Sequence, residues 1–283
     1  MPLACVLTTV WNEAARLPRW IAHYGAAVGL ENLFVEDDGS DDGSTDGLGA
    51  VNVIRRPRGV YDERERTARI SAWASGLLGR YDTVIYADAD ELLVPADGAS
   101  LREWLARPHP PTVTAIGLDV LDVPGVDAGP LDPTRPLLAQ RGHARLNPTY
   151  CKPLVTRAPI RWRPGLHFSD AATAFDGLLL LHTRYADRAA AVARLAQLRT
   201  VDVADQALFS THWQAADATI TGVLDAAAQA PWRPFTAADR SAWEALLTAR
   251  LAGAPPNAVN LIRHLWDEHP SWFTLPEGLR CDG

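Results

Sequence analysis

Short apolar runs alternate with helix-like patterns in the first hundred residues. Four runs have the length and composition of buried strands, at residues 4–10, 32–35, 51–54 and 83–86. Residues 14–28 carry apolar side chains at helical spacing and end at Gly29, and residues 62–78 predict a second helix. This alternation predicts an α/β fold, with a mostly parallel sheet flanked by helices.

The pattern is less regular after residue 100. A short helix at 100–106 and strands at 112–118 and 178–181 are predicted, while residues 152–155 and 160–162 suggest a hairpin. Residues 119–148 are rich in Pro, Gly and Asp, which predicts a long loop. Helices are expected at 187–198, 216–228, 236–252 and 256–268. We therefore expect an α/β domain over residues 1–185 and a helical extension, residues 186–283, packed on it.

Composition narrows the class of protein. The 283 residues are 47% hydrophobic, enough for one large domain with an appendage, and no apolar run reaches the length of about 18 residues that spans a membrane. The N-terminus lacks the pattern of a signal peptide. Three scattered cysteines suit a reducing compartment, so a cytoplasmic location is expected. A net charge of −7 argues against nucleic acid as a partner.

The strand predicted at 83–86 runs directly into an acidic turn. Asp88, Asp90 and Glu91 follow it, and a second apolar run begins at Leu92. Carboxylates crowded at the end of a buried strand repel one another, and a divalent cation among them relieves that repulsion. The turn predicts a metal site at the carboxyl edge of an open α/β sheet, with a solvated acidic turn as the alternative.

A second acidic segment, residues 36–46, follows the strand predicted at 32–35. A calcium loop starting at Asp38 matches in part, but its twelfth position is Gly49 rather than Glu. A polar turn is another interpretation. A third interpretation of this segment is that a carboxylate at the end of the strand accepts hydrogen bonds from the base or ribose of a nucleotide.

Three motifs in order resemble those of family 2-type glycosyltransferases with the GT-A fold. Trp11-Asn12-Glu13 resembles the family's Tyr-Asn-Glu signature, residues 37–44 resemble its DDGS-x-DGT loop, and Asp88-Ala89-Asp90 matches its DxD motif. The form Asp-x-Asp-Glu-Leu-Leu-Val, the early segment 20–24 and the late segment 181–183 are similar to a DxDE-containing branch. The resemblance covers residues 1–185, which it identifies as a GT-A catalytic domain.

The resemblance implies a metal-dependent hexosyltransferase that uses a nucleotide sugar, most simply a UDP-sugar, and inverts the anomeric centre. It implies Mn²⁺ or Mg²⁺ on Asp88 and Asp90, because hard oxygen ligands suit these ions. The residues that it implies for nucleotide-sugar binding are Thr9, Trp11, Glu13, Asp37, Asp38, Arg66 and Asp88, with Arg69 as an alternative to Arg66.

A third metal ligand and a general base are less clearly marked. His182, at the end of the strand predicted at 178–181, is the preferred ligand, with His167 as the competitor. The general base that inversion requires has no clean motif match; Asp170 is chosen, with Asp119 and Asp122 as alternatives. Lys152 and Arg184 are candidates for contacts with phosphate oxygens.

Two other functions compete with the transferase. The strand with Asp88 and Asp90 superficially resembles the nucleophile strand of haloacid-dehalogenase-type phosphatases, but that reading leaves residues 36–46 unexplained. A GT-A module that binds nucleotide or glycan without turnover is the other alternative. The expected partners of the transferase are the donor and a glycan or small-molecule acceptor, with possible peripheral association with a membrane.

Overall fold

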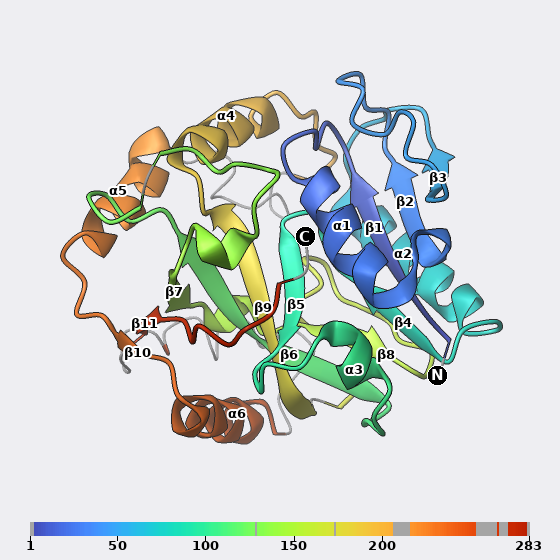
Figure 1. Ribbon diagram of the computed structural model, residues 1–283. Coiled ribbons are helices and arrows are strands. Elements are labelled where there is room, and N and C mark those ends of the chain that lie inside the picture. The colour runs from blue at the N-terminus through green and yellow to red at the C-terminus, as the bar shows by residue number, and fades with distance from the viewer. Residues whose placement is uncertain are drawn as a thin grey trace.

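The computed structural model describes residues 3–127, 129–172, 174–205, 216–252, 265 and 271–281. These residues form an eleven-stranded sheet with helices on both of its faces (Figure 1). No helix within the described ranges is both long and apolar enough to cross a membrane. The predicted α/β fold is confirmed.

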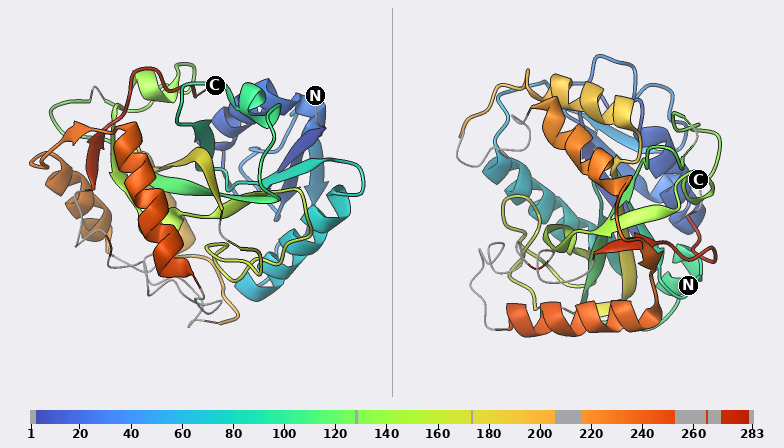
Figure 2. Two further views of the ribbon diagram at one scale, coloured as in Figure 1. Left: turned by 90° about the horizontal axis from the view of Figure 1, so that it is seen from below. Right: turned by 90° about the vertical axis from the view of Figure 1, so that its left-hand side faces the viewer.

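The N-terminal half of the sheet is parallel, in the order β4-β1-β2-β3. Its strands are β1 (Ala4–Val10), β2 (Leu33–Asp37), β3 (Asn52–Arg55) and β4 (Thr83–Tyr86). Helices α1 (Leu17–Val28) and α2 (Glu63–Leu77) lie on opposite sides of these strands (Figure 2). The four strands and both helices fall where the sequence predicts them.

Local sequence explains where the two helices begin and end. The Asp62 side chain accepts hydrogen bonds from the backbone N–H groups of Arg64 and Glu65, which caps the first turn of α2. Gly29 ends α1 with a φ of 91°, a conformation that costs glycine little because it has no Cβ atom.

The second half of the sheet is mixed and is built around β6 (Thr112–Leu121). This strand pairs antiparallel with β7 (His143–Leu146) and β8 (Pro153–Thr156), and parallel with β9 (Phe175–Tyr185). β8 also pairs antiparallel with β4 and so joins the two halves. β5 (Glu91–Pro95) pairs antiparallel with β9, beside the short helix α3 (Leu101–Leu105).

Two sequence-based expectations for this half are wrong. Residues 152–155 and 160–162 do not form a hairpin, because β8 uses its two edges for β4 and β6, and Trp162 makes only an isolated bridge with Ser169. The loop expected from Asp119 begins later, since β6 continues through Leu121, and it contains β7. Short single-turn 3₁₀ helices lie at Leu30–Asn32, Leu137–Ala139 and Pro148–Tyr150.

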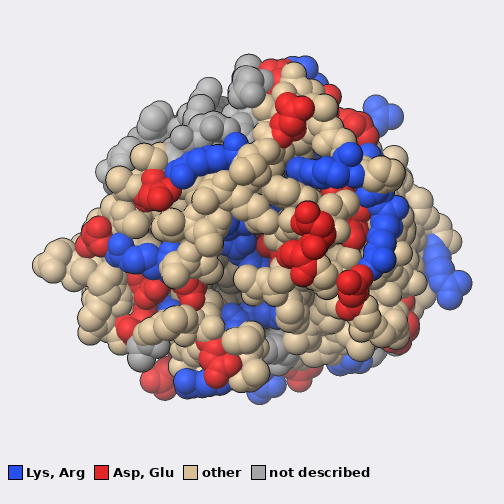
Figure 3. All heavy atoms as spheres, turned by 90° about the horizontal axis from the view of Figure 1, so that it is seen from above, with Lys and Arg blue, Asp and Glu red and all other residues tan. Residues whose placement is uncertain are grey.

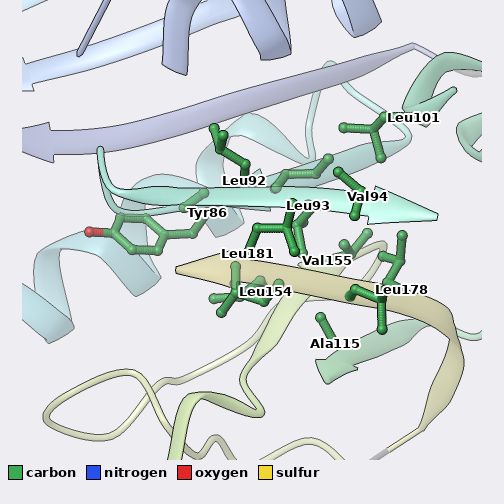
Figure 4. Packing of buried hydrophobic residues seen from close by; sticks show 14 of the residues in the cluster. Tyr86, Leu92, Leu93, Val94, Leu101, Ala115, Leu154, Val155, Leu178 and Leu181 are labelled. Atoms are coloured by element: carbon green, nitrogen blue, oxygen red, sulfur yellow. The ribbon is translucent and has the colours of Figure 1, made fainter. Parts of the chain in front are cut away.

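One hydrophobic core runs through both halves of the sheet. Leu92, Leu93 and Val94 of β5 pack with Leu178 and Leu181 of β9, and all five are buried (Figure 4). The ring of Tyr86 belongs to the same core while its hydroxyl points away from this cluster (Figure 4). β5 is thereby fixed directly after the acidic turn, which holds the turn in place.

The C-terminal segment contributes both helices and strands. The predicted helices are found as α4 (Arg188–Leu198), α5 (Asp217–Ala227) and α6 (Ala237–Leu251), with α4 and α6 at opposite edges of the molecule (Figures 1 and 2). The helix expected at 256–268 lies outside the described residues, apart from residue 265. β10 (Arg233–Pro234) and β11 (Trp272–Thr274) extend the same sheet through β7, so the segment after residue 185 is not helical throughout; the division into two domains stays a prediction.

Candidate functional site

A large cavity lies where the N-terminal parallel strands end. Its volume is about 400 Å³, and it is lined by Thr9 on β1, by Asp38 directly after β2 and by Asp88 shortly after β4. Side chains of both charges lie close together on the face seen from above (Figure 3). Ligands of open α/β sheets bind at this edge, because the strand ends leave a crevice between the loops.

Asp88 is held in the cavity wall by cations. Its Oδ1 accepts hydrogen bonds from Arg66 Nη2 at 2.5 Å and from the Tyr86 hydroxyl at 2.5 Å, and Lys152 Nζ lies 3.4 Å from its Oδ2. Burial favours the neutral acid, but Arg66 and Lys152 more than offset it and lower the pKa of Asp88. Arg66 also donates to the Thr9 hydroxyl at 3.1 Å, so both of these predicted binding residues serve to fix Asp88.

Asp90 faces an oriented histidine. His182 Nε2 lies 3.5 Å from Asp90 Oδ2, while His182 Nδ1 lies 2.7 Å from Oδ1 of the fully buried Asp119. Tyr150 stacks on the imidazole with 3.9 Å between ring centroids. Burial disfavours the imidazolium, but Asp90 and Asp119 outweigh it and raise the pKa of His182 to about 9.

Strand register produces this arrangement. β9 lies between β5 and β6, and His182 is opposite Glu91 on one side and Asp119 on the other. Glu91 also contacts Lys152, the residue directly before β8, with Lys152 Nζ 2.5 Å from Glu91 Oε1 in a site where both side chains are buried. Burial penalises the ammonium, but the attraction of Glu91 and Asp88 raises the pKa of Lys152 and keeps it charged.

Asp38 and Trp11 form the other side of the cavity. Asp38 is paired with Arg58 and lies 3.5 Å from Arg56. The Arg58 guanidinium lies over the Trp11 ring at 4.2 Å from its centroid, within cation–π distance.

Helix α4 closes this side of the cavity. Arg194 donates to the backbone carbonyl of Trp11 at 2.9 Å and pairs with Glu13 at 2.5 Å. Glu13 also pairs with Arg16 at 3.2 Å. Arg194 lies more than 180 residues from Trp11 along the chain, so no local sequence motif predicts this contact.

Two of the predicted residues, Asp37 and Asp170, lie away from the cavity lining. Asp37 is buried beneath it, where it accepts from Ser40 N at 2.8 Å and from the Thr45 hydroxyl at 2.6 Å, and so shapes the loop that carries Asp38. Asp170, the predicted base, is exposed and accepts from Arg161 N at 2.9 Å. The structure does not bring Asp170 to the cavity, because the segment that carries it turns back on residues 161–163.

The two alternative bases have structural partners. Asp119 orients His182, and Asp122 accepts from the backbone N–H of Arg188 at 3.0 Å. His167, the competitor of His182 for the metal, does not line the cavity. Of the two histidines, only His182 lies beside Asp90.

The fit to a divalent cation is partial. No group of three or more His, Cys, Asp and Glu side chains in the described part of the chain is arranged as a metal cluster. Asp88 already accepts from Arg66 and Tyr86. Asp90 Oδ2 and His182 Nε2 form a two-ligand set, and Asp119 holds the other imidazole nitrogen as carboxylates do behind metal-bound histidines. Further ligands would have to come from a bound molecule or water.

Comparison with known proteins gives weak likenesses only. No protein-family profile and no curated protein sequence matches the chain. Among solved structures, glucosyl-3-phosphoglycerate synthase from Mycobacterium tuberculosis, in complex with Mg²⁺ and UDP, aligns at 22% identity and a TM-score of 0.25, over 32% of this chain and 34% of that one. S. aureus TarS 1-349 aligns at 10% identity and a TM-score of 0.36, over 80% of this chain and 70% of that one.

The chain thus spans about a third of the length of the synthase. TarS 1-349 in complex with UDP aligns similarly, at 10% identity and a TM-score of 0.34, over 78% of this chain and 69% of that one. Every one of these TM-scores is below 0.5, so the strands, register and contacts of this chain itself define its fold and site.

Proposed function

We propose that this protein is a metal-dependent glycosyltransferase that moves a hexosyl group from a nucleotide sugar to an acceptor hydroxyl. The observation that supports the proposal most directly is the pair of Asp90 and His182 in the wall of a cavity at the carboxyl ends of parallel strands, with the buried Asp119 behind His182. The ordered motifs at Trp11, Asp38 and Asp88 support the same function. A volume of about 400 Å³ is within the range of small-molecule sites.

Asp90 and His182 would hold the Mg²⁺ or Mn²⁺, with Asp119 orienting the imidazole. The ion would supply positive charge to a diphosphate leaving group. Lys152 and Arg66 hold Asp88 in place, so their charges add to the positive potential beside it. On this proposal the sugar nucleotide binds with its diphosphate at Asp90 and its nucleoside toward Asp38 and Trp11.

Asp38 is the acceptor proposed for the donor groups of a base or ribose. It is about a quarter exposed at the cavity, and Arg56 and Arg58 keep its oxygens near Trp11. A carboxylate there recognises N–H and O–H donors of a uridine, the nucleoside that we propose. The flat faces of Trp11 and the guanidinium of Arg58 suit stacking against a base.

Inversion, which the sequence resemblance implies, lacks an assigned base. Each of the seven carboxylates in the described lining pairs with a cation or caps a backbone N–H, and Asp170 is not among them. The anomeric configuration of the first product, read by NMR, tests inversion independently of the transfer itself.

The same pairing of carboxylates favours a second candidate function. A GT-A module that binds the nucleotide without turnover needs no free base. The two functions differ in whether nucleoside diphosphate is released from a nucleotide sugar. We also propose a cytoplasmic location; the cysteines Cys5, Cys151 and Cys281 are buried and form no disulfide, as a reducing compartment allows.

The test is thermal unfolding with UDP, GDP, CDP and dTDP, each with and without Mn²⁺. A ligand at about 100 times its Kd adds about 2.7 kcal/mol to the free energy of unfolding, which raises the Tm. We expect one nucleotide, UDP, to raise the Tm only with metal. Asp90→Ala removes the effect, and Asp97→Asn, an exposed aspartate outside the cavity, keeps it. If no nucleotide stabilises the wild-type protein with any metal, the transferase proposal fails.

A further inference from the structure

A second, smaller cavity adjoins the first. Its volume is about 100 Å³, and it shares three lining residues with the larger cavity: Arg16, Ala89 and Arg184. Ala89 lies between Asp88 and Asp90. A molecule in the second cavity therefore lies next to the acidic turn, and Asp38 does not line this cavity.

The second cavity has an excess of positive charge. Three arginines line it (Arg16, Arg19 and Arg184) against one carboxylate, Asp187. Asp187 is occupied by the backbone, because its Oδ1 accepts from Ala190 N at 2.9 Å and its Oδ2 from Leu131 N at 2.8 Å. Among the described residues, only Arg16 of the three has a carboxylate partner, Glu13 at 3.2 Å.

The guanidinium groups of Arg19 and Arg184 have N–H donors without an acceptor in the described part of the chain. Within the described residues, the Arg184 side chain makes no ion pair or hydrogen bond; its guanidinium lies 5.9 Å from the Tyr185 ring centroid. Arg19 uses Nη2 to bond the backbone carbonyls of Asp132 and Arg135, while its buried Nε has no partner there. A buried N–H without an acceptor is costly, and a bound anion would satisfy it.

Apart from Thr183, the remaining lining is apolar and includes Leu92, Leu131 and Pro133. Apolar walls lower the local dielectric constant and strengthen the attraction of a guanidinium for an anion. Guanidinium groups bind planar or tetrahedral oxyanions through paired N–H donors.

We propose that this second cavity is the acceptor subsite and that it selects an acceptor carrying an oxyanion, a carboxylate or a phosphate monoester. This proposal rests on the proposed transferase function. The anion sits among Arg16, Arg19 and Arg184, which leaves a hydroxyl a few atoms away free to reach past Ala89 toward the sugar held at Asp90. Neutral glycan ends lack the charge that this subsite binds.

The first test is the binding of small anions to the full chain saturated with UDP and Mn²⁺. Inorganic phosphate and acetate are the probes for the two oxyanions, glycerol is the neutral probe, and KCl keeps the ionic strength constant. We expect saturable stabilisation by at least one anion and none by glycerol. An anion that displaces UDP instead of binding beside it overturns the subsite.

Arginine variants locate the binding. Arg19→Gln and Arg184→Gln each weaken anion binding by about tenfold or more, since a hydrogen bond to a charged group is lost. Arg19 lines only the smaller cavity, so Arg19→Gln leaves the affinity for UDP unchanged. Arg80→Gln is the matched control, because Arg80 is exposed and lines neither cavity. Arg184 has no described polar partner to lose, so its variant separates binding from folding.

The outcomes separate the two proposals. Saturable binding that survives both arginine substitutions, or UDP binding without saturable anion binding, overturns the acceptor subsite and leaves the transferase standing. Failure of any nucleotide to bind the wild-type protein overturns both. Whichever of phosphate and acetate saturates at the lower concentration identifies the anion, and release of UDP from the donor with glycerol 3-phosphate, glycerate or glycerol then checks that choice.

Discussion

The two acidic segments are alike in sequence and differ in their structural roles. Residues 36–46 contain six carboxylates, of which only Asp38 lines the large cavity. The turn at residues 88–91 contains three, and all of them line it. Each carboxylate of the turn has a cationic partner: Arg66 for Asp88, His182 for Asp90 and Lys152 for Glu91.

The first segment uses its acids to build a loop. Asp37 holds Ser40 N and Thr45, Asp41 bonds the Asn12 side chain, and Asp42 accepts from Ala14 N and Ser44 N. The turn at 88–91 instead lies between β4 and β5 near the middle of the sheet, where Glu91 is fully buried, Asp88 and Asp90 are about a quarter exposed, and cations balance all three carboxylates. Position in the sheet, and not the density of acids, decides which segment concentrates charge at the cavity.

Removing Lys152 is expected to have the largest effect on stability, because Lys152 neutralises a buried carboxylate of the turn at 88–91. Lys152→Met leaves Glu91 buried without its partner, which costs about 3–5 kcal/mol of the free energy of unfolding. The double variant Lys152→Met/Glu91→Leu recovers most of this loss, because both charges are gone. Urea unfolding monitored by tryptophan fluorescence measures both variants; a loss below about 1 kcal/mol in the single variant contradicts a buried, paired turn.

Asp119→Asn tests the support behind His182. The change weakens the hydrogen bond to His182 Nδ1, and outer-shell substitutions of this kind cost about 10–100-fold in metal affinity. Titration with Mn²⁺ in the presence of UDP gives the affinity. Asp97→Asn, an aspartate outside the cavity, is the control. Unchanged Mn²⁺ affinity in Asp119→Asn means that His182 is not a ligand.

Asp37→Asn tests how much the buried carboxylate of the first segment contributes to stability. Asp37 is 2% exposed, and the amide replaces one acceptor oxygen with a donor facing Ser40 N or the Thr45 hydroxyl. We expect a loss of about 1–3 kcal/mol in the free energy of unfolding. Thermal unfolding measures it, and a loss as large as that of Lys152→Met erases the proposed contrast.

Asp41→Asn is expected to change the free energy of unfolding least. Asp41 is exposed and its Oδ1 accepts from Asn12 Nδ2, a contact that an asparagine oxygen also makes. The free energy of unfolding changes by about 0.5 kcal/mol or less. The same urea titration measures it, and a larger loss means that exposed acids of this loop are structural.

Much of residues 3–95 was predictable because its signals are local. Apolar runs mark β1 to β4, Asp62 caps α2 and Gly29 ends α1. The predictions were weaker after residue 112, where β6, β8 and β9 find partners far apart in the chain. The expected hairpin failed for this reason: the sequence of β8 shows that it is apolar, but not that its neighbours are β4 and β6.

The sequence by itself determined that Asp38, Asp88 and Asp90 follow strands of an α/β sheet, because parallel strands bring their carboxyl ends to one edge. Only the tertiary structure decided their partners. The register of β9 against β5 and β6 brought His182 to Asp90 and Asp119 in place of His167. Contacts of residues 168–170 with residues 161–163 kept Asp170 away from the cavity. Pairing across a sheet depends on which strands meet and in what register, and a one-residue slip would turn His182 to the other face.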